Sequence, residues 1–244
     1  YCDYPIIKSI EKYNKKEKFI YDLSVEGENF FAGNAPLLIH NTFISTANAI
    51  VICGAKPVFV DIKDNLLIDE DLIEKSITKK TKAIIPVHLF GKICNMDKIM
   101  EIAKKHNLKV VEDSAQCIKP GIIQGDIACF SFYRTKNFSC FEGGAVTTND
   151  SNLLKRMRLY SDQGQESKHH HTVIGYNYRM SDLNAVMINH QIKYHFIGGD
   201  SELGRFGTKD GHYPIPVYEQ PIYKKLGITG NCPNTERICK DIKK

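Results

Sequence analysis

Five polar residues stand at or near the ends of apolar runs, where the side chains of an enzyme often do their chemistry. Asp113 closes the run KVVED, and Gln116 follows it within the motif EDSAQ. His88 follows the run IIPV, Ser131 lies in the run CFSF, and Lys136 lies in a loop close to a Gly-Gly pair. Ligands usually bind at the carboxyl ends of parallel strands. These residues are therefore the first candidates for a binding or catalytic site.

Four of these candidates also have an ordinary structural explanation. An Asp at a strand end is often a helix N-cap. His88 is equally well explained as a satisfied core histidine, and Ser131 either binds a phosphate or satisfies a backbone group. A loop lysine such as Lys136 is usually a solvated surface residue. The run His169–His171 has no matching carboxylate or Cys spacing, so we predict a polar loop there and no metal site.

The elements that must position these residues alternate along the chain. We predict helices over 43–51, 69–77 and 96–106, and strands over 56–61, 83–87, 110–113, 129–132 and 145–148. Strands that alternate with helices are typical of an α/β domain with a largely parallel sheet.

The composition is that of an ordinary globular protein, with 42% hydrophobic and 25% charged residues. The net charge of +5 comes from scattered lysines, so we expect no nucleic-acid partner. No apolar run has the length of a membrane span, and nothing resembles a signal peptide. The eight cysteines include no C-x-x-C pair. We therefore expect reduced thiols, a cytoplasmic location and no membrane contact. The chain begins with Tyr1 and not Met, which suggests a processed or truncated piece.

Roughly the first forty residues resemble the C-terminal end of an intein. The motifs are YDLSVEGENFFA and a closing apolar strand followed by His40, Asn41 and Thr42. The resemblance implies that Asn41 cyclises onto its own carbonyl and cuts the bond to Thr42, that His40 assists, and that Thr42 is the hydroxyl nucleophile of splicing. An intein also needs an N-terminal half, whose motifs are absent before residue 20. We therefore expect splicing to need an upstream fragment as partner. We expect cleavage at Asn41 to need no such fragment.

The segment from Thr42 to about Tyr194 resembles the DegT/StrS type of sugar-nucleotide aminotransferase, pyridoxal-phosphate enzymes of fold type I. The motifs occur in order: TFISTANAI, GAKPVFVDI, TKAIIPVHLFG, MDKIMEIAKKHNLKVVEDSAQ, FSFYRTKN, GGAVTTND and GYNYRMSDLNAV. The resemblance implies pyridoxal 5'-phosphate as cofactor, a keto sugar nucleotide as substrate and glutamate as amino donor. A related branch that dehydrates sugars has His in place of the lysine, so Lys136 argues against that branch.

The resemblance also implies a role for each matching residue. Lys136 would be the Schiff-base lysine and would move protons between cofactor and substrate, which requires a lowered pKa. Asp113 would keep the pyridinium nitrogen protonated, and Gln116 would lie near the phenolic oxygen. Three further contacts are implied: Phe43 would stack on the ring, Ser131 would bind the phosphate, and Asn177 would reach the phosphate site of the neighbouring subunit. The last contact implies a homodimer.

We therefore predict three segments. Residues 1–41 would be a short all-β intein fragment, residues 42–196 a fold-type I large domain that is incomplete at its N-terminus, and residues 197–244 the remnant of a small domain. The Gly/Ser/Thr-rich phosphate loop of the family would lie upstream and is replaced by the intein piece. The alternatives are a non-catalytic remnant that keeps the fold, or a chain in which only the intein piece is chemically active.

Overall fold

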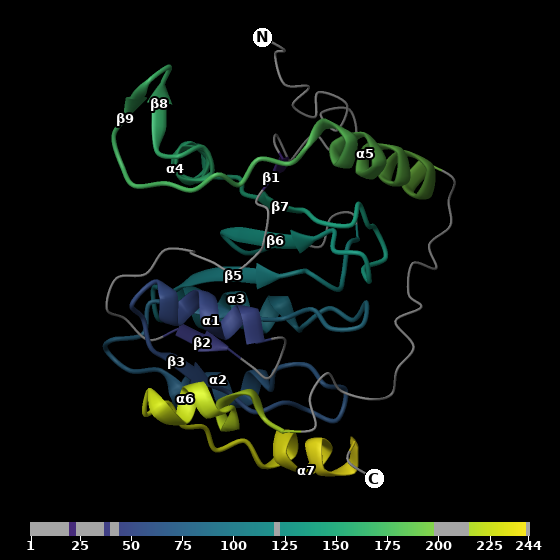
Figure 1. Ribbon diagram of the computed structural model, residues 1–244. Helices are drawn as coiled ribbons and strands as arrows, with labels where there is room; N and C mark the ends of the chain where they lie inside the picture. Colours follow the sequence, from purple (N-terminus) through teal and green to yellow (C-terminus); the bar gives the residue numbers. More distant parts are fainter. Residues whose placement is uncertain (1–19, 23–36, 40–43, 120–122, 198–214, 243–244) are drawn as a thin grey trace. The chain divides into compact units, whose positions relative to one another are not determined.

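The computed structural model describes residues 20–22, 37–39, 44–119, 123–197 and 215–242 (Figure 1). These residues fall into two compact units. The first unit contains residues 20–22 and 126–197, and the second contains 37–39, 44–119, 123–125 and 215–242. His40, Asn41, Thr42 and Phe43 lie outside the described residues, so the roles expected for them stay predictions.

The second unit is built on a parallel sheet. Its strand order is β3 (Pro57–Phe59), β2 (Leu37–Ile39), β4 (Ala83–Ile85) and β5 (Lys109–Asp113), and each neighbouring pair is parallel. The helices α1 (Ile44–Ile52), α2 (Glu70–Ser76) and α3 (Met96–Lys105) alternate with the strands along the chain. The predicted α/β class and its helices and strands are confirmed here, with ends that differ by a few residues.

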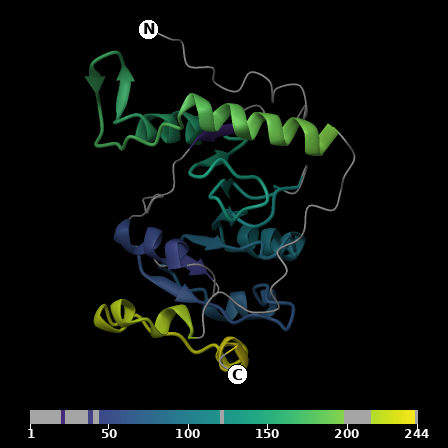
Figure 2. The same ribbon diagram turned by 45° about the vertical axis from the view of Figure 1, so that its right-hand side comes forward.

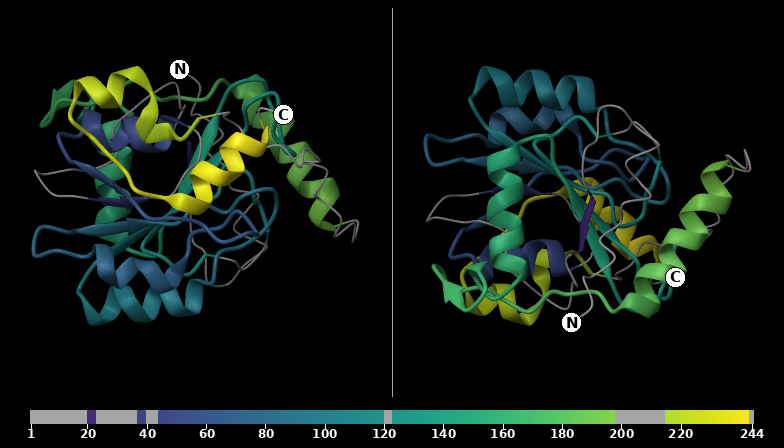
Figure 3. Two further views of the ribbon diagram at one scale, coloured as in Figure 1. Left: turned by 90° about the horizontal axis from the view of Figure 1, so that it is seen from below. Right: turned by 90° about the horizontal axis from the view of Figure 1, so that it is seen from above.

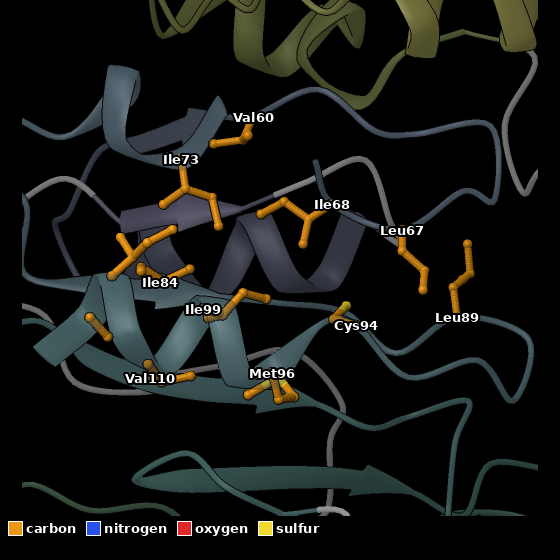
Figure 4. Packing of buried hydrophobic residues seen from close by; sticks show 12 residues of the cluster. Val60, Leu67, Ile68, Ile73, Ile84, Leu89, Cys94, Met96, Ile99 and Val110 are labelled. Atoms are coloured by element: carbon orange, nitrogen blue, oxygen red, sulfur yellow. The ribbon is translucent and has the colours of Figure 1, made fainter. Parts of the chain in front are cut away.

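Helices cover both faces of this sheet (Figure 3). Ile84 of β4 packs with α2 and α3, in the cluster drawn in Figure 4. Its neighbour Ile85 packs on the opposite face with Ala47 and Ile50 of α1. Because successive side chains of a strand point to opposite faces, a strand that is covered on both sides must be apolar throughout. The run AIIPV meets this requirement.

The two helices on one face begin at side-chain caps that the sequence supplies. Asp69 accepts a hydrogen bond from the Asp71 amide at the start of α2, and Asn95 accepts one from the Lys98 amide at the start of α3. A capping carboxylate or amide satisfies a backbone N–H that the helix itself leaves unpaired. Met96, Ile99, Ile102 and Ala103 recur at helical spacing on the buried face of α3. Local sequence therefore determines where these helices lie.

The C-terminal residues are part of the core of the second unit. They form the 3-10 helix η2 (Val217–Glu219) and the helices α6 (Pro221–Lys225) and α7 (Pro233–Ile242). Tyr218 and Tyr223 pack against Phe59, with ring centroids 5.3 and 6.4 Å away. The hydroxyl group of Tyr223 donates to the Asn48 side chain at 2.6 Å.

The first unit has antiparallel strands. The strand β6 (Ile127–Ser131) pairs with β7 (Gly144–Thr147), and β7 pairs with β1 (Ile20–Asp22). Residues 132–143 join β6 to β7 without a crossover helix, and strands joined in this way run antiparallel. The expectation of a largely parallel sheet therefore holds only for the second unit.

The described part of the first unit also contains two helices and a hairpin (Figure 2). The helix α4 (Ser151–Ser161) is followed by the hairpin of β8 (Gln165–Ser167) and β9 (His170–His171), and then by α5 (Asp182–Ile197). No helix in the described part of the chain is both long and apolar enough to cross a membrane.

The strands in the region assigned to the intein do not form a separate all-β piece among the described residues. Instead, β1 pairs with β7, and β2 pairs with β3 and β4. A short apolar strand that ends a splicing domain cannot be told by its sequence from a buried parallel strand. The assignment of residues 1–41 to an intein and of residues 197–244 to a small-domain remnant remains a prediction. The pairing of a strand does not show which gene segment encoded it.

Candidate active site

Asp113 ends β5 with its carboxylate held by two donors. The Thr46 hydroxyl of α1 donates to Oδ2 at 2.7 Å, and the Ala115 amide donates to Oδ1 at 3.1 Å. No helix follows Asp113, because residues 114–117 form a turn. The alternative that Asp113 is a helix N-cap is therefore wrong. Its half-buried carboxylate is an oriented acceptor at the carboxyl end of a parallel strand.

Gln116 is buried beside this strand end, with an exposed fraction of 6%. Its side-chain oxygen accepts a hydrogen bond from the Phe90 amide at 3.2 Å, and its backbone oxygen accepts one from Gly91 at 3.0 Å. Phe90 and Gly91 both have positive φ, 52° and 74°, so the chain turns tightly after β4. This turn brings two backbone amides to Gln116 and fixes the orientation of its carboxamide.

His88 is a satisfied core histidine, the ordinary explanation that its sequence context allowed. It is fully buried, its Nδ1 accepts from the Cys94 amide at 3.2 Å, and its Nε2 lies 2.7 Å from Glu112 Oε2. The Cys94 thiol donates to the Val87 carbonyl at 3.2 Å. Burial raises the pKa of this thiol to about 12. Sequence reasoning did not single out Glu112, although a charged residue inside an apolar strand is a signal in itself.

Lys136 lies in the loop between β6 and β7, as predicted. Its amide donates to the Tyr133 carbonyl at 2.8 Å, and its side chain is half-buried. The Phe132 amide donates to the Gly143 carbonyl at 2.8 Å, and the Cys140 amide donates to the Phe132 carbonyl at 3.0 Å. The loop is therefore closed by its own backbone and is more constrained than a surface loop.

The helix α5 also holds this loop. Gln191 accepts from the Ser139 amide at 2.9 Å and donates to the Ser139 carbonyl at 2.6 Å. Asn184 donates to the Glu142 carbonyl at 2.8 Å. Gln191 and Asn184 were not predicted, because amide residues on a helix carry no distinctive signal in one sequence. Together they fix the backbone at Ser139 and Glu142, in the stretch that follows the fully buried Phe138.

Ser131 and Asn177 complete the predicted set in the first unit. The Ser131 oxygen accepts a hydrogen bond from the Tyr133 amide at 3.3 Å, which leaves its own O–H as a donor. Asn177 is exposed, in a segment that bridges to Asp162. The rings of its neighbours Tyr176 and Tyr178 stack with centroids 5.0 Å apart.

The predicted residues are divided between the units. Asp113 and Gln116 lie together in the second unit, and Ser131, Lys136 and Asn177 lie in the first. Among the described residues, no group of three or more His, Cys, Asp or Glu side chains could hold a metal ion. The histidines His169–His171 lie in the exposed β8–β9 hairpin region.

Comparison with known proteins shows one family. Residues 24–195 match the DegT/DnrJ/EryC1/StrS aminotransferase family. GDP-perosamine synthase of Caulobacter vibrioides is 42% identical over 60% of this chain and 42% of its own length. UDP-N-acetyl-3-dehydro-alpha-D-glucosamine 3-aminotransferase of Acidithiobacillus ferrooxidans is 42% identical over 82% of this chain and 69% of its own length.

A solved structure is also similar. NtdA of Bacillus subtilis with bound cofactor PMP has a TM-score of 0.67 and 31% identity, over 73% of this chain and 45% of that one. The chain thus spans less than half the length of GDP-perosamine synthase and of NtdA. The family model covers well over half of this chain and includes all five described candidate residues. This chain belongs to the DegT/DnrJ/EryC1/StrS aminotransferase family.

Proposed function

We propose that the protein is a pyridoxal-phosphate-dependent aminotransferase that transfers the amino group of glutamate to a keto sugar nucleotide. The observation that carries this proposal is the Asp113 carboxylate, which two donors hold as an oriented acceptor at the end of β5. Membership of an aminotransferase family supports the reaction class. The relatives that act on GDP- and UDP-linked sugars support the substrate class.

The donors and acceptors in each unit fit the cofactor. Within the second unit, Asp113 suits a protonated ring nitrogen, and the Gln116 carboxamide suits the phenolic oxygen. Within the first unit, the amine of Lys136 suits the aldehyde, and the Ser131 hydroxyl suits a phosphate oxygen. We assign Phe43 to the face of the ring, and Asn177 to the phosphate site of a second subunit in a homodimer.

The chemistry then divides between cofactor and protein. The bound cofactor supplies an electron sink for the substrate carbanion. Asp113 would hold the proton at the ring nitrogen, and Lys136 would move a proton between the cofactor and the substrate carbon that gains or loses the amino group. Gln191 and Asn184 keep the Lys136 loop in one conformation, so that the amine stays in reach of its proton acceptor.

Borohydride trapping tests the proposal. We expect the chain incubated with pyridoxal 5'-phosphate to gain a reducible label, which peptide mapping places on Lys136. Lys136→Ala should abolish the label, whereas Lys155→Ala, which removes an exposed lysine of α4, should leave it unchanged. Chain that is loaded with pyridoxal 5'-phosphate and not reduced should then be assayed with keto sugar nucleotides and glutamate.

A wild-type chain that takes up no label at Lys136 would contradict catalysis by this chain alone. It would favour the alternative that the chain is a non-catalytic remnant. The trapping should then be repeated with an upstream fragment that carries the Gly/Ser/Thr-rich phosphate loop. Recovery of the label would show that the fragment completes the site.

We also propose that residues 1–41 are an intein fragment that cleaves the chain between Asn41 and Thr42. The motif of His40, Asn41 and Thr42 after an apolar strand supports this chemistry, and β2 ends at Ile39, just before the motif. Mass spectrometry should detect a product that begins at Thr42, and Asn41→Ala should abolish it. A mass that stays intact even with a matching N-terminal half would count against the proposal.

The pairing of β2 gives this cleavage a structural consequence. Because β2 lies between β3 and β4, a cut after Asn41 separates the strand from the chain that follows it. The cleaved product would have to retain β2 as a bound peptide or replace it with another strand, since an open gap leaves backbone groups unpaired. An upstream aminotransferase fragment is the partner that we propose for this position.

A further inference from the structure

The second unit contains a fully buried carboxylate that the proposed reaction does not use. Glu112 has an exposed fraction of 0%. Its Oε1 accepts hydrogen bonds from the Gln124 amide at 2.7 Å and the Gly125 amide at 2.5 Å, and its Oε2 lies 2.7 Å from His88 Nε2. A buried carboxylate is tolerated only where donors surround it in this way. Burying such a group costs free energy even when donors surround it.

The hydrogen bonds of His88 determine which groups are donors. Its Nδ1 accepts from the Cys94 amide, so this nitrogen carries no proton. The neutral ring must then carry its proton on Nε2, which donates to Glu112. Three N–H groups therefore converge on one carboxylate, and none of the three can act as an acceptor.

The same carboxylate lies next to the proposed cofactor residues in the chain. The Asp113 amide donates to the Pro86 carbonyl at 2.9 Å, and the Asp113 carbonyl accepts from the His88 amide at 2.9 Å. Gln116 binds the amides of Phe90 and Gly91. The segments 86–94 and 112–117 are thus joined by their backbones, and the pair of Glu112 and His88 joins them again through side chains.

We propose that Glu112 is a positioning residue, which holds the β4 and β5 ends together and thereby orients Asp113 and Gln116. Val110 packs with α3, and Val111 packs with α1, so the alternation of β5 sends Glu112 and Asp113 to opposite faces. Glu112 thus acts through the backbone of Asp113, from the face away from Thr46. The relevance of this role to the cofactor rests on the proposed function.

The negative charge of Glu112 is required by the arrangement of donors. In Glu112→Gln, the amide oxygen can face the Gln124 and Gly125 amides only if the NH2 group faces His88. His88 must then accept at Nε2 and move its proton to Nδ1, where it meets the N–H of Cys94. Every orientation leaves two donors facing each other, so this isosteric change must loosen the contact.

A second variant weakens the same contact and keeps the charge. An added Cβ at Gly125 would lie 2.9 Å from the Val110 carbonyl oxygen and 3.0 Å from Glu112 Oε1. Gly125→Ala therefore pushes the 124–125 backbone away from the carboxylate. The matched control is Glu74→Gln, which removes an exposed carboxylate that pairs with Lys105 and His106.

Amide hydrogen exchange on the full chain without cofactor tests the proposal. In Glu112→Gln and Gly125→Ala, we expect the amides of His88, Gly91 and Ala115 to exchange at least about 10-fold faster, because a buried hydrogen bond to a charge is lost. The amides of α7 and of β7 should keep their wild-type rates. Glu74→Gln should change none of these rates.

Two results would overturn the proposal. Exchange that rises equally over the whole chain in both variants would make Glu112 a general stabilising residue. Unchanged exchange at His88, Gly91 and Ala115 would show that Glu112 does not hold the β4 and β5 ends together. If Glu112→Gln does not fold, Gly125→Ala decides between these results. The exchange experiment does not depend on cofactor binding, so a wild-type chain that binds no cofactor contradicts catalysis by this chain alone and leaves the exchange result standing.

A chain that binds the cofactor gives an independent readout. The absorbance of the bound cofactor would depend on its protonation, which Asp113 would influence through the ring nitrogen. We expect Glu112→Gln to shift the pH of the spectral change in the same direction as Asp113→Asn, and Glu74→Gln to leave it in place. A merely structural defect would lower the unfolding temperature without this shift, and that outcome would contradict the positioning role.

Discussion

At the scale of the residue, the Asp113 carboxylate depends on a hydroxyl group that comes from a different element. Thr46 of α1 donates to Oδ2 at 2.7 Å, across 67 positions of sequence. An acceptor held by a hydroxyl keeps one rotamer, which reduces the entropy that ligand binding must overcome. Thr46 is therefore a second positioning residue for the proposed cofactor contact.

Replacing this hydroxyl should weaken cofactor binding without disturbing the fold. We expect Thr46→Val to raise the dissociation constant of pyridoxal 5'-phosphate by about 10-fold, the cost of one hydrogen bond to a charged group. Titration of the chain with pyridoxal 5'-phosphate, followed by absorbance, measures this dissociation constant. Thr46→Ser keeps the hydroxyl and should bind like the wild type. Equal affinity of the Val variant and the wild type would show that Asp113 does not need Thr46.

Two buried thiols make the fold sensitive to alkali. Burial raises the pKa of Cys94 and of Cys232 from 9.0 to about 12. The folded state therefore favours the protonated thiols. This contribution to stability is complete below the unfolded pKa near 9, and it is lost as the pH rises from there towards 12.

The free energy of unfolding should reveal this loss in urea titrations at several pH values. Between about pH 8 and pH 10.5, we expect the wild type to lose more stability than Cys94→Ala, by at most about 1.4 kcal/mol per pH unit above pH 9. Comparing the two slopes cancels the lysines and tyrosines that titrate in both proteins. Parallel curves would contradict a raised thiol pKa.

At the scale of the element, α7 begins at a carboxylate that is far away in the sequence. The buried Asp61 accepts from the Asn234 amide at 2.8 Å, and from the amide and the hydroxyl group of Thr235 at 3.0 and 2.9 Å. It also accepts from the Ile62 amide at 2.9 Å. A carboxylate at a helix N-terminus satisfies unpaired amides and complements the helix dipole. Asp61 therefore attaches α7 to the end of β3.

Removing this cap should destabilise the second unit. We expect Asp61→Ala to lower the free energy of unfolding by about 3 kcal/mol, because several buried donors lose their acceptor. The control is Asp64→Ala, which breaks the exposed ion pair with Arg237 and should cost less than about 1 kcal/mol. Equal and small losses in both variants, measured by urea denaturation, would show that α7 does not depend on Asp61.

At the scale of the whole molecule, the first unit exposes large apolar side chains. Ile174, Leu183 and Val186 have exposed fractions of 88%, 71% and 61%, and Phe141 and Tyr194 are also exposed. Leu183 and Val186 lie on α5, the helix that holds the Lys136 loop. Leu183 and Val186 are three positions apart on one helix, and exposed apolar side chains that neighbour each other are typical of a surface that binds a partner. They support the proposed homodimer.

Charges on α5 should therefore separate the subunits. We expect light scattering to show a dimer for the wild type and a monomer for the variant with both Leu183→Glu and Val186→Glu. The control Ile222→Glu, at a half-exposed position of the second unit, should remain dimeric. A wild type that is monomeric at about 50 μM, well above a micromolar dissociation constant, would contradict the homodimer.

The amino-acid sequence by itself determined the helices and strands of the α/β region and the candidates Asp113, Gln116, Ser131 and Lys136. These inferences depend on local patterns: side chains that alternate along a strand, apolar residues at helical spacing, and polar residues just beyond a strand. The predicted roles of these residues depend on family motifs, which are also local.

Only the tertiary structure decided which distant residues hold these helices, strands and candidate residues in place. Glu112 meets His88 across 24 positions, Gln191 meets Ser139 across 52, and Asp61 meets Thr235 across 174. It also decided that β2 pairs with β3 and β4, although the same apolar run suits the last strand of an intein. The physical reason is common to these cases: a hydrogen bond or a strand pairing depends on which groups the folded chain brings within about 3 Å, and distance along the sequence does not determine that.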